Sequence, residues 1–216
     1  MKPVIIAIDG VDYAGKSTMV TRLKEHFTAQ GYRVESINFP TSDGYGAKAR
    51  EAFVSGDVSA TAEYMVKNMV EVMDGLSQLD GPDVIIYDRH ILSTVANQGL
   101  LAAHPRAAEE GLYAHPYRPQ QYYVLTLPFL VAEKRAIERA EREGASWDDG
   151  MTEGHLSSEE SWVALNRSYV HGAQALTNNM EGTTFHNPQC HSQNVIDSAF
   201  ASICMNINAE LDKVAA

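Results

Sequence analysis

The segment G-V-D-Y-A-G-K-S-T at residues 10–18 constrains the fold more than any other part of the sequence, because it fits the phosphate-binding pattern G-x-x-x-x-G-K-[ST]. The apolar run V-I-I-A-I-D at residues 4–9 precedes it and predicts a buried strand, and apolar residues at helical spacing follow it over residues 16–30. A strand before and a helix after are the context in which this motif binds a nucleoside triphosphate. The alternative is a plain glycine turn between a strand and a helix.

The residue types in this loop suit a polyphosphate. Glycines at both ends allow the backbone to curl so that successive N–H groups point inward, and the following helix adds its positive N-terminal end. The Lys16 ammonium is expected to reach the outer phosphates, and the Ser17 hydroxyl to hold a Mg²⁺ ion that bridges them. The loop residues expected to bind ATP are Gly10, Tyr13, Ala14, Gly15, Lys16, Ser17 and Thr18.

Composition and charge narrow the class of partner. The chain has 216 residues, of which 44% are hydrophobic, so one domain over residues 1–216 with an inserted lid fits its size. A net charge of -11 argues against a nucleic-acid partner, which needs clustered Lys and Arg. Two cysteines are too few for a disulfide framework, and no apolar stretch reaches membrane-spanning length. With no room for a signal peptide before the first strand, we expect a cytoplasmic protein with no membrane partner.

Predicted strands and helices alternate along the chain, which favours an α/β fold with a parallel sheet and helices on both faces. Combined with the phosphate-binding loop, this predicts a P-loop NTPase fold. The polar stretch over residues 144–158 has no periodicity, and we expect a lid at about residues 137–158. The expected strands are 4–9, 33–39, 84–87, 121–127 and 183–187, and the expected helices are 16–30, 47–54, one capped by Ser59, 105–113, 129–143, 159–176 and 194–213.

A second candidate element follows the buried strand at residues 84–87, where Asp88 and Arg89 come next in the chain. In parallel sheets ligands bind at the carboxyl ends of the strands, which is where the phosphate-binding loop also lies. Asp88 is expected to bind a magnesium-bound water, and Arg89 to neutralise a phosphate held between donor and acceptor. The alternative is an ordinary surface ion pair at a strand end.

These motifs together resemble the thymidylate kinase family. D-R-H-I-L-S-T-V-A-N-Q-G at residues 88–99 is similar to that family's D-R-[HY]-x-x-S-x-x-A-Y-Q-G segment, and residues 10–18 are similar to its phosphate loop, including the acidic Asp12. The similarity runs in order over about two thirds of the chain. It also takes in Phe39-Pro40, Arg118-Pro119 and Lys134-Arg135-Ala136.

The resemblance implies phosphoryl transfer from ATP to a deoxynucleoside monophosphate, with Mg²⁺, in a homodimer. Lys16 and Arg89 are then expected to stabilise the transferring group, and Asp12 to accept a hydrogen bond from the sugar 3′-hydroxyl. Tyr64 falls where the family stacks a ring on the base; the alternative is a core aromatic. The remaining implied positions are Ser17 and Asp88 for the metal, Arg135 for ATP, and Phe39, Pro40, Asn68, Asn97 and Gln98 for the acceptor.

The sequence departs from the family pattern on the acceptor side. Asn68 stands where the family usually carries an arginine that donates to thymine O4, so the enzyme is expected to tolerate or prefer another base, such as that of dCMP or a modified pyrimidine. Asn97 replaces the aromatic that crowds the sugar 2′-position, which puts the exclusion of ribose in doubt. The loop after Phe39-Pro40 lacks the family's arginine, unless Lys48 or Arg50 takes its place.

A catalytic arginine is also expected from the lid side. Tyr13 occupies a place that is arginine in one subgroup of the family, whereas Arg135, Arg139 and Arg142 lie along one predicted helix. We expect Arg139 to act on the transferring group. The alternative is a solvated charged helix, because glutamates are interleaved with these arginines.

Two other functions fit parts of the sequence. A deoxynucleoside kinase shares the phosphate-binding loop but needs a carboxylate base near a 5′-hydroxyl. A non-catalytic switch that binds ATP without an acceptor also fits the loop, but it leaves the arginine-bearing lid unexplained.

Overall fold

The computed structural model describes residues 2–77, 81–144, 155–177 and 180–215. Its centre is a five-stranded sheet in the order β2-β3-β1-β4-β5, in which all pairs of neighbouring strands are parallel. This confirms the predicted parallel α/β sheet. The strands are β1 (Val4–Gly10), β2 (Val34–Asn38), β3 (Val84–Asp88), β4 (Gln121–Leu125) and β5 (Thr184–His186).

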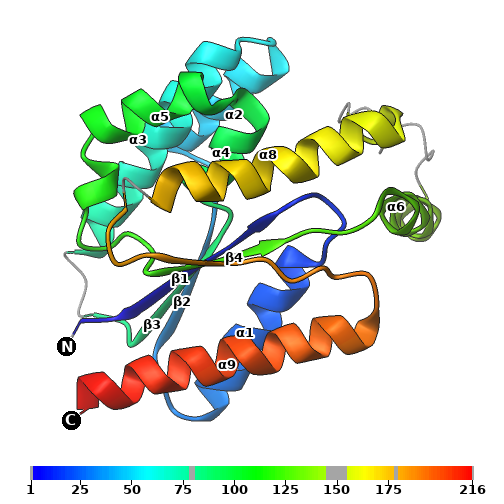
Figure 1. Cartoon of the computed structure of the whole chain (residues 1–216). Helices are drawn as coiled ribbons and strands as arrows, with labels where there is room; N and C mark the ends of the chain where they lie inside the picture. Colours follow the sequence, from blue (N-terminus) through cyan, green and yellow to red (C-terminus); the bar gives the residue numbers. More distant parts are fainter. Residues whose placement is uncertain (1, 78–80, 145–154, 178–179, 216) are drawn as a thin grey trace.

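Helices cover both faces of the sheet (Figure 1). One face carries α1 and α9, and the other carries α3, α4, α5 and α8, while α6 lies beyond the carboxyl end of β4 (Figure 1). No helix within the described residues is both long enough and apolar enough to cross a membrane. The helices are α1 (Lys16–Ala29), α2 (Gly44–Val54), α3 (Val58–Leu76), α4 (Ile91–Gln98), α5 (Leu100–Glu109), α6 (Phe129–Glu143), α8 (Glu159–Thr177) and α9 (Gln193–Ala215), with short 3₁₀ turns at Leu112–Ala114 and His155–Ser157.

Burial explains why the central strands read as continuous apolar runs. Every residue of β1 and of β3 is buried, because helices pack on both faces of the sheet. The carboxyl ends of β1, β3 and β4 lie side by side. Ile8 of β1 pairs with Asp88 of β3, and Gly10 of β1 pairs with Leu125 of β4. The two motifs therefore meet at one edge of the sheet.

The helices differ from the prediction: α4 was not predicted at all, and α3, α2 and α5 begin clearly earlier than expected. Helix α3 begins at Val58 and its N-cap is Asp57, not Ser59; the Asp57 side chain accepts a hydrogen bond from the Ala60 N–H at 2.9 Å. Helix α2 begins at Gly44 rather than at residue 47. Helix α5 occupies Leu100–Glu109 with Pro105 inside it, because Gly99 turns the chain at φ 86° and the helix starts directly afterwards.

The predicted lid lies partly outside the described residues. Its first part, residues 137–143, forms the last turns of α6, and its end at His155–Ser157 is a 3₁₀ turn. Residues 145–154 are not among those described. The lid therefore stays a prediction.

Candidate functional site

The phosphate-binding loop connects β1 to α1, and three of its residues have a left-handed or otherwise unusual backbone conformation. Gly10, Tyr13 and Gly15 all have positive φ, at 129°, 60° and 88°. Gly15 is the N-cap of α1, so the first N–H groups of that helix point into the loop. A curled backbone with a helix N-terminus at its end is a ready anion site.

The Lys16 ammonium lies over this loop and forms hydrogen bonds with two loop residues. Its Nζ donates to the Val11 carbonyl at 2.7 Å and to Asp12 Oδ1 at 3.3 Å, and the side chain is 6% exposed. Burial, together with the nearby charge of Arg89, lowers the pKa of Lys16 to about 8. The ammonium is therefore a desolvated charge for which an incoming anion is a better partner than water.

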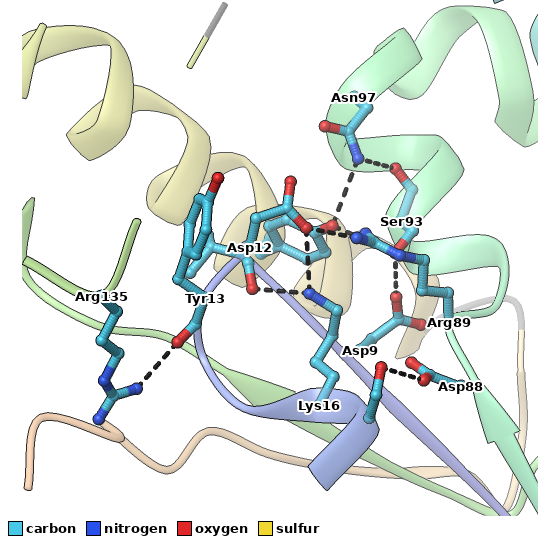
Figure 2. Close-up of polar contacts among 12 residues, drawn as sticks. Asp9, Asp12, Tyr13, Lys16, Asp88, Arg89, Ser93, Asn97 and Arg135 are labelled. Atoms are coloured by element: carbon cyan, nitrogen blue, oxygen red, sulfur yellow. Dashed lines mark hydrogen bonds and ion pairs between the residues drawn. The ribbon is translucent and has the colours of Figure 1, made fainter. Parts of the chain in front are cut away.

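Arg89 reaches the same place from the end of β3. Its guanidinium pairs with Asp12, so that one carboxylate lies between two cations, Lys16 and Arg89 (Figure 2). Burial on its own favours the neutral form of Arg89, but the acidic groups around it, Asp12 foremost with Tyr169 and Asp9, together hold its pKa above the ordinary value. The structure thus brings together Lys16 and Arg89, which were predicted to stabilise the transferring group, and Asp12, which was predicted to bind the sugar 3′-hydroxyl.

The two residues predicted for the metal also lie together. The Ser17 hydroxyl donates to Asp88 Oδ2 at 2.7 Å, joining the start of α1 to the end of β3 (Figure 2). A hydroxyl and a carboxylate are oxygen ligands of the kind that Mg²⁺ prefers, directly or through water. These residues fit the expected ion.

Asp9 is a member of the site that the sequence reading did not single out. It is fully buried and accepts hydrogen bonds from the His90 N–H at 3.0 Å and from the Ser93 hydroxyl. Burial raises its pKa to about 6. The only signal in the sequence was an acidic residue inside an apolar run, directly before the first glycine of the loop.

On the acceptor side, the turn after Phe39-Pro40 is held by Asn68. The Thr41 N–H donates to Asn68 Oδ1 at 3.0 Å, and Asn68 Nδ2 donates to the Thr41 hydroxyl at 2.7 Å. Arg50 adds bonds to the carbonyls of Pro40 and Thr41. The Asn68 amide is fully buried, and both of its ends are taken up by this turn.

The other residues predicted to bind the acceptor are Tyr64, Asn97 and Gln98, and the contacts of the first two are with other side chains and the backbone. Tyr64 on α3 stacks on Tyr45 of α2, with ring centroids 6.2 Å apart and an interplanar angle of 21°. Asn97 on α4 donates through Nδ2 to the Ser93 carbonyl at 2.7 Å and to the Tyr169 hydroxyl at 3.3 Å. Gln98 is half-buried at the end of α4.

The arginines of α6 divide into two environments. Arg135 donates to the Tyr13 carbonyl and to the Cys190 carbonyl, each at 2.9 Å, and so links α6 to the phosphate-binding loop (Figure 2). Arg139 has an exposed side chain, and its Nε donates to Glu143 at 2.9 Å on the same helix. In this arrangement Arg135 borders the phosphate-binding loop, whereas Arg139 pairs with Glu143 of its own helix and its catalytic role stays a prediction.

Comparisons with known proteins identify similar chains. A family model described as thymidylate kinase matches residues 8–150. A protein named thymidylate kinase from Xanthomonas oryzae pv. oryzae (strain PXO99A) is 37% identical over 134 residues, which cover 59% of this chain and 59% of that protein. A thymidylate kinase from Desulfotalea psychrophila is 27% identical over 136 residues, covering 61% of this chain and 66% of the relative. The matched part thus spans less than two thirds of either relative.

Proposed function

The chain belongs to the thymidylate kinase family, and on this premise we propose that it transfers a phosphoryl group from ATP to the 5′-phosphate of a deoxynucleoside monophosphate. The observation that carries the proposal is the meeting of Lys16 and Arg89 around one carboxylate, that of Asp12. Two cations that approach one anion from separate segments of the chain, the start of α1 and the residue after β3, are arranged to bind a phosphoryl group between donor and acceptor.

Catalysis in this scheme consists of positioning and charge stabilisation. The loop N–H groups and Lys16 bind the outer phosphates of ATP, and Arg89 contacts the transferring group from the acceptor side. When phosphates take over the two cations, Asp12 is released to accept a hydrogen bond from the sugar 3′-hydroxyl. Arg135 borders the ATP end of the loop through its bond to the Tyr13 carbonyl.

Ser17 and Asp88 would hold the Mg²⁺ ion. When bound, the ion neutralises charge on the phosphate oxygens of ATP and fixes their orientation. The protein's own part is to keep the hydroxyl and the carboxylate 2.7 Å apart at the junction of α1 and β3.

We further propose that the acceptor is a pyrimidine deoxynucleotide whose base is read loosely. Position 68 carries no arginine, and the Asn68 amide already accepts from the Thr41 N–H and donates to the Thr41 hydroxyl. A binding site in which no polar side chain hydrogen-bonds the base discriminates only weakly between related bases. Asn97 likewise directs its amide to Ser93 and Tyr169, so we expect the exclusion of ribose to be weak.

A coupled assay with ATP and a panel of monophosphates tests the function. The panel holds dTMP, dCMP, dUMP, 5-substituted pyrimidine deoxynucleotides and their ribose counterparts. We expect turnover of several pyrimidine monophosphates, with kcat/KM values within about a hundredfold of one another. A much stronger preference for dTMP would remove the proposal on the base. Phosphorylation of free nucleosides alone would favour a deoxynucleoside kinase, and slow hydrolysis unaffected by any monophosphate would favour an ATP-binding switch.

Replacing Asn68 with alanine separates a role in the turn from a role in base reading. The change removes both bonds to Thr41, so the turn after Pro40 loosens and KM for the acceptor rises about five- to tenfold, equally for dTMP and dCMP. KM for ATP stays the same. Asn206→Ala is the matched control, because its amide donates to Tyr123 at 2.9 Å, away from this turn. A change in the dTMP/dCMP ratio would instead show that Asn68 contacts the base.

The family resemblance also implies a homodimer, and the composition of the sequence favours the cytoplasm; we include both in the proposal. Light scattering on the purified protein measures the oligomeric state. A monomer at assay concentration with full activity would contradict the dimer.

A further inference from the structure

We propose that Asp9 is a positioning residue for Arg89, and that Ser93 and Tyr169 hold Asp9 in the orientation that this requires. The proposal rests on the proposed function, since it assigns to Arg89 the grip on the transferring phosphoryl group. It adds residues from β1, α4 and α8 to the site. The side chains of Asp9 and Ser93 lie next to Arg89 in the close-up of the site (Figure 2).

The backbone of Arg89 is the first reason. Arg89 has φ 71°, a left-handed conformation that is uncommon for a residue with a side chain. Both peptide groups around it are tied to β1: the Arg89 N–H donates to the Ile8 carbonyl at 2.9 Å, and the His90 N–H donates to Asp9 Oδ2 at 3.0 Å. The first tie is backbone to backbone, whereas the second depends on one side chain. The sheet therefore holds the peptide group before Arg89, and the Asp9 side chain holds the peptide group after it.

The burial of Asp9 is the second reason. A carboxylate that is 0% exposed is costly, and burial raises its pKa to about 6. An apolar residue would fit the rest of β1, whose other residues are buried without any carboxylate. A buried carboxylate that destabilises the fold is expected where its hydrogen bonds are needed to position functional residues.

A directed chain of hydrogen bonds ends on Asp9. The Ser93 hydroxyl donates to Asp9 Oδ1, so its oxygen is free to accept from the Tyr169 hydroxyl 3.1 Å away. The Tyr169 oxygen in turn accepts from Asn97 Nδ2 at 3.3 Å. Every donor in this chain points toward Asp9, so the chain fits an ionised carboxylate that acts only as an acceptor.

Asp9→Asn is the first test. Asparagine has nearly the same shape, but its Nδ2 is a donor, so it cannot accept from both the His90 N–H and the Ser93 hydroxyl. Arg89 then loses part of its backbone support, and a small displacement of a catalytic group is costly to the rate. We expect kcat to fall about a hundredfold, with KM for ATP and for the acceptor within about threefold of wild type.

Tyr169→Phe and Tyr87→Phe form a matched pair. Both remove one hydroxyl from a buried tyrosine, but the Tyr87 hydroxyl bonds the Tyr117 carbonyl at 3.1 Å and has no contact with Asp9 or Ser93. We expect Tyr169→Phe to lower kcat about fivefold and Tyr87→Phe to leave it unchanged. Equal effects of the two would show that the Tyr169 hydroxyl matters only as a buried polar group, and would overturn its place in the proposal.

A double-mutant cycle with Arg89→Ala shows whether Asp9 acts through Arg89. If it does, adding Asp9→Asn to Arg89→Ala costs less than about twofold in kcat, because there is no guanidinium left to position. A full additional loss would overturn the proposal. Should Asp9→Asn fail to fold, Ser93→Ala replaces it in the cycle, since it removes one bond to Asp9 and keeps the carboxylate.

A crystal structure of Asp9→Asn gives a readout that does not need activity. We expect Arg89 to leave its left-handed conformation and to lose its ion pair with Asp12. An unchanged Arg89 would overturn the positioning role even if the wild-type protein turned over no monophosphate. Conversely, a displaced Arg89 in a protein without kinase activity would keep the positioning role and reject the proposed function.

Discussion

Arg89→Ala is expected to lower kcat by about 10³-fold or more while changing KM for ATP by less than about threefold. Arg89 reaches the proposed phosphoryl site from the end of β3, whereas the loop proposed to bind ATP follows β1, and the Arg89 guanidinium and the Lys16 ammonium both pair with Asp12. Its contacts with the substrate are therefore expected to be strongest when charge is spread over the transferring group. Losing such a contact lowers kcat more than it weakens ground-state binding.

Arg89→Lys refines this result. A lysine keeps the positive charge but offers a compact ammonium in place of the planar, two-pronged donor of a guanidinium. We expect it to recover at most about tenfold of the lost rate. Arg22→Ala is the matched control, because Arg22 on α1 pairs with Asp197 on α9 at 2.9 Å, on the other side of the sheet. Steady-state kinetics of the three variants decide the matter: a loss in kcat below about tenfold for Arg89→Ala would remove Arg89 from the catalytic centre.

The sequence was sufficient for the parts of the site that are local or that the sheet topology imposes. The phosphate-binding loop is a contiguous motif, so its strand, turn and helix could be read directly. Asp88 and Arg89 could be placed near it because the carboxyl ends of parallel strands meet at one edge. No contact between side chains had to be known for either inference.

What the sequence did not reveal depends on contacts between distant residues. Asp9 meets Ser93, and Ser93 meets Tyr169, only once α4 and α8 have packed on β1. The spacing of Tyr64 and Asn68 correctly placed both on one helix, α3, but it could not show that the turn after Pro40 takes up the Asn68 amide. For Arg139 the interleaved glutamates left a solvated charged helix open as the alternative, and the structure pairs its exposed side chain with Glu143.

Among glycine-to-alanine substitutions at the site, Gly10→Ala is expected to lower the free energy of unfolding most. A Cβ at Gly10 would lie 2.0 Å from the Leu125 carbonyl oxygen and 2.6 Å from the Leu125 nitrogen, and both are backbone atoms of β4. Neither can move without breaking the pairing of β1 with β4, and the Val11 N–H also donates to that carbonyl, at 3.1 Å. The φ of 129° adds strain for any residue with a side chain.

Gly31→Ala isolates the backbone strain from the steric clash. Gly31 also has positive φ, at 90°, but a Cβ there meets no atom within 4 Å. We expect Gly31→Ala to cost about 1 kcal/mol and Gly10→Ala at least about 3 kcal/mol, which in a chain of this size corresponds to Tm losses of about 3 °C and about 9 °C or more. Calorimetry of both variants measures the difference. Equal losses would mean that β4 yields to the added methyl group, and the close contact of the phosphate-binding loop with β4 would then not be what fixes its shape.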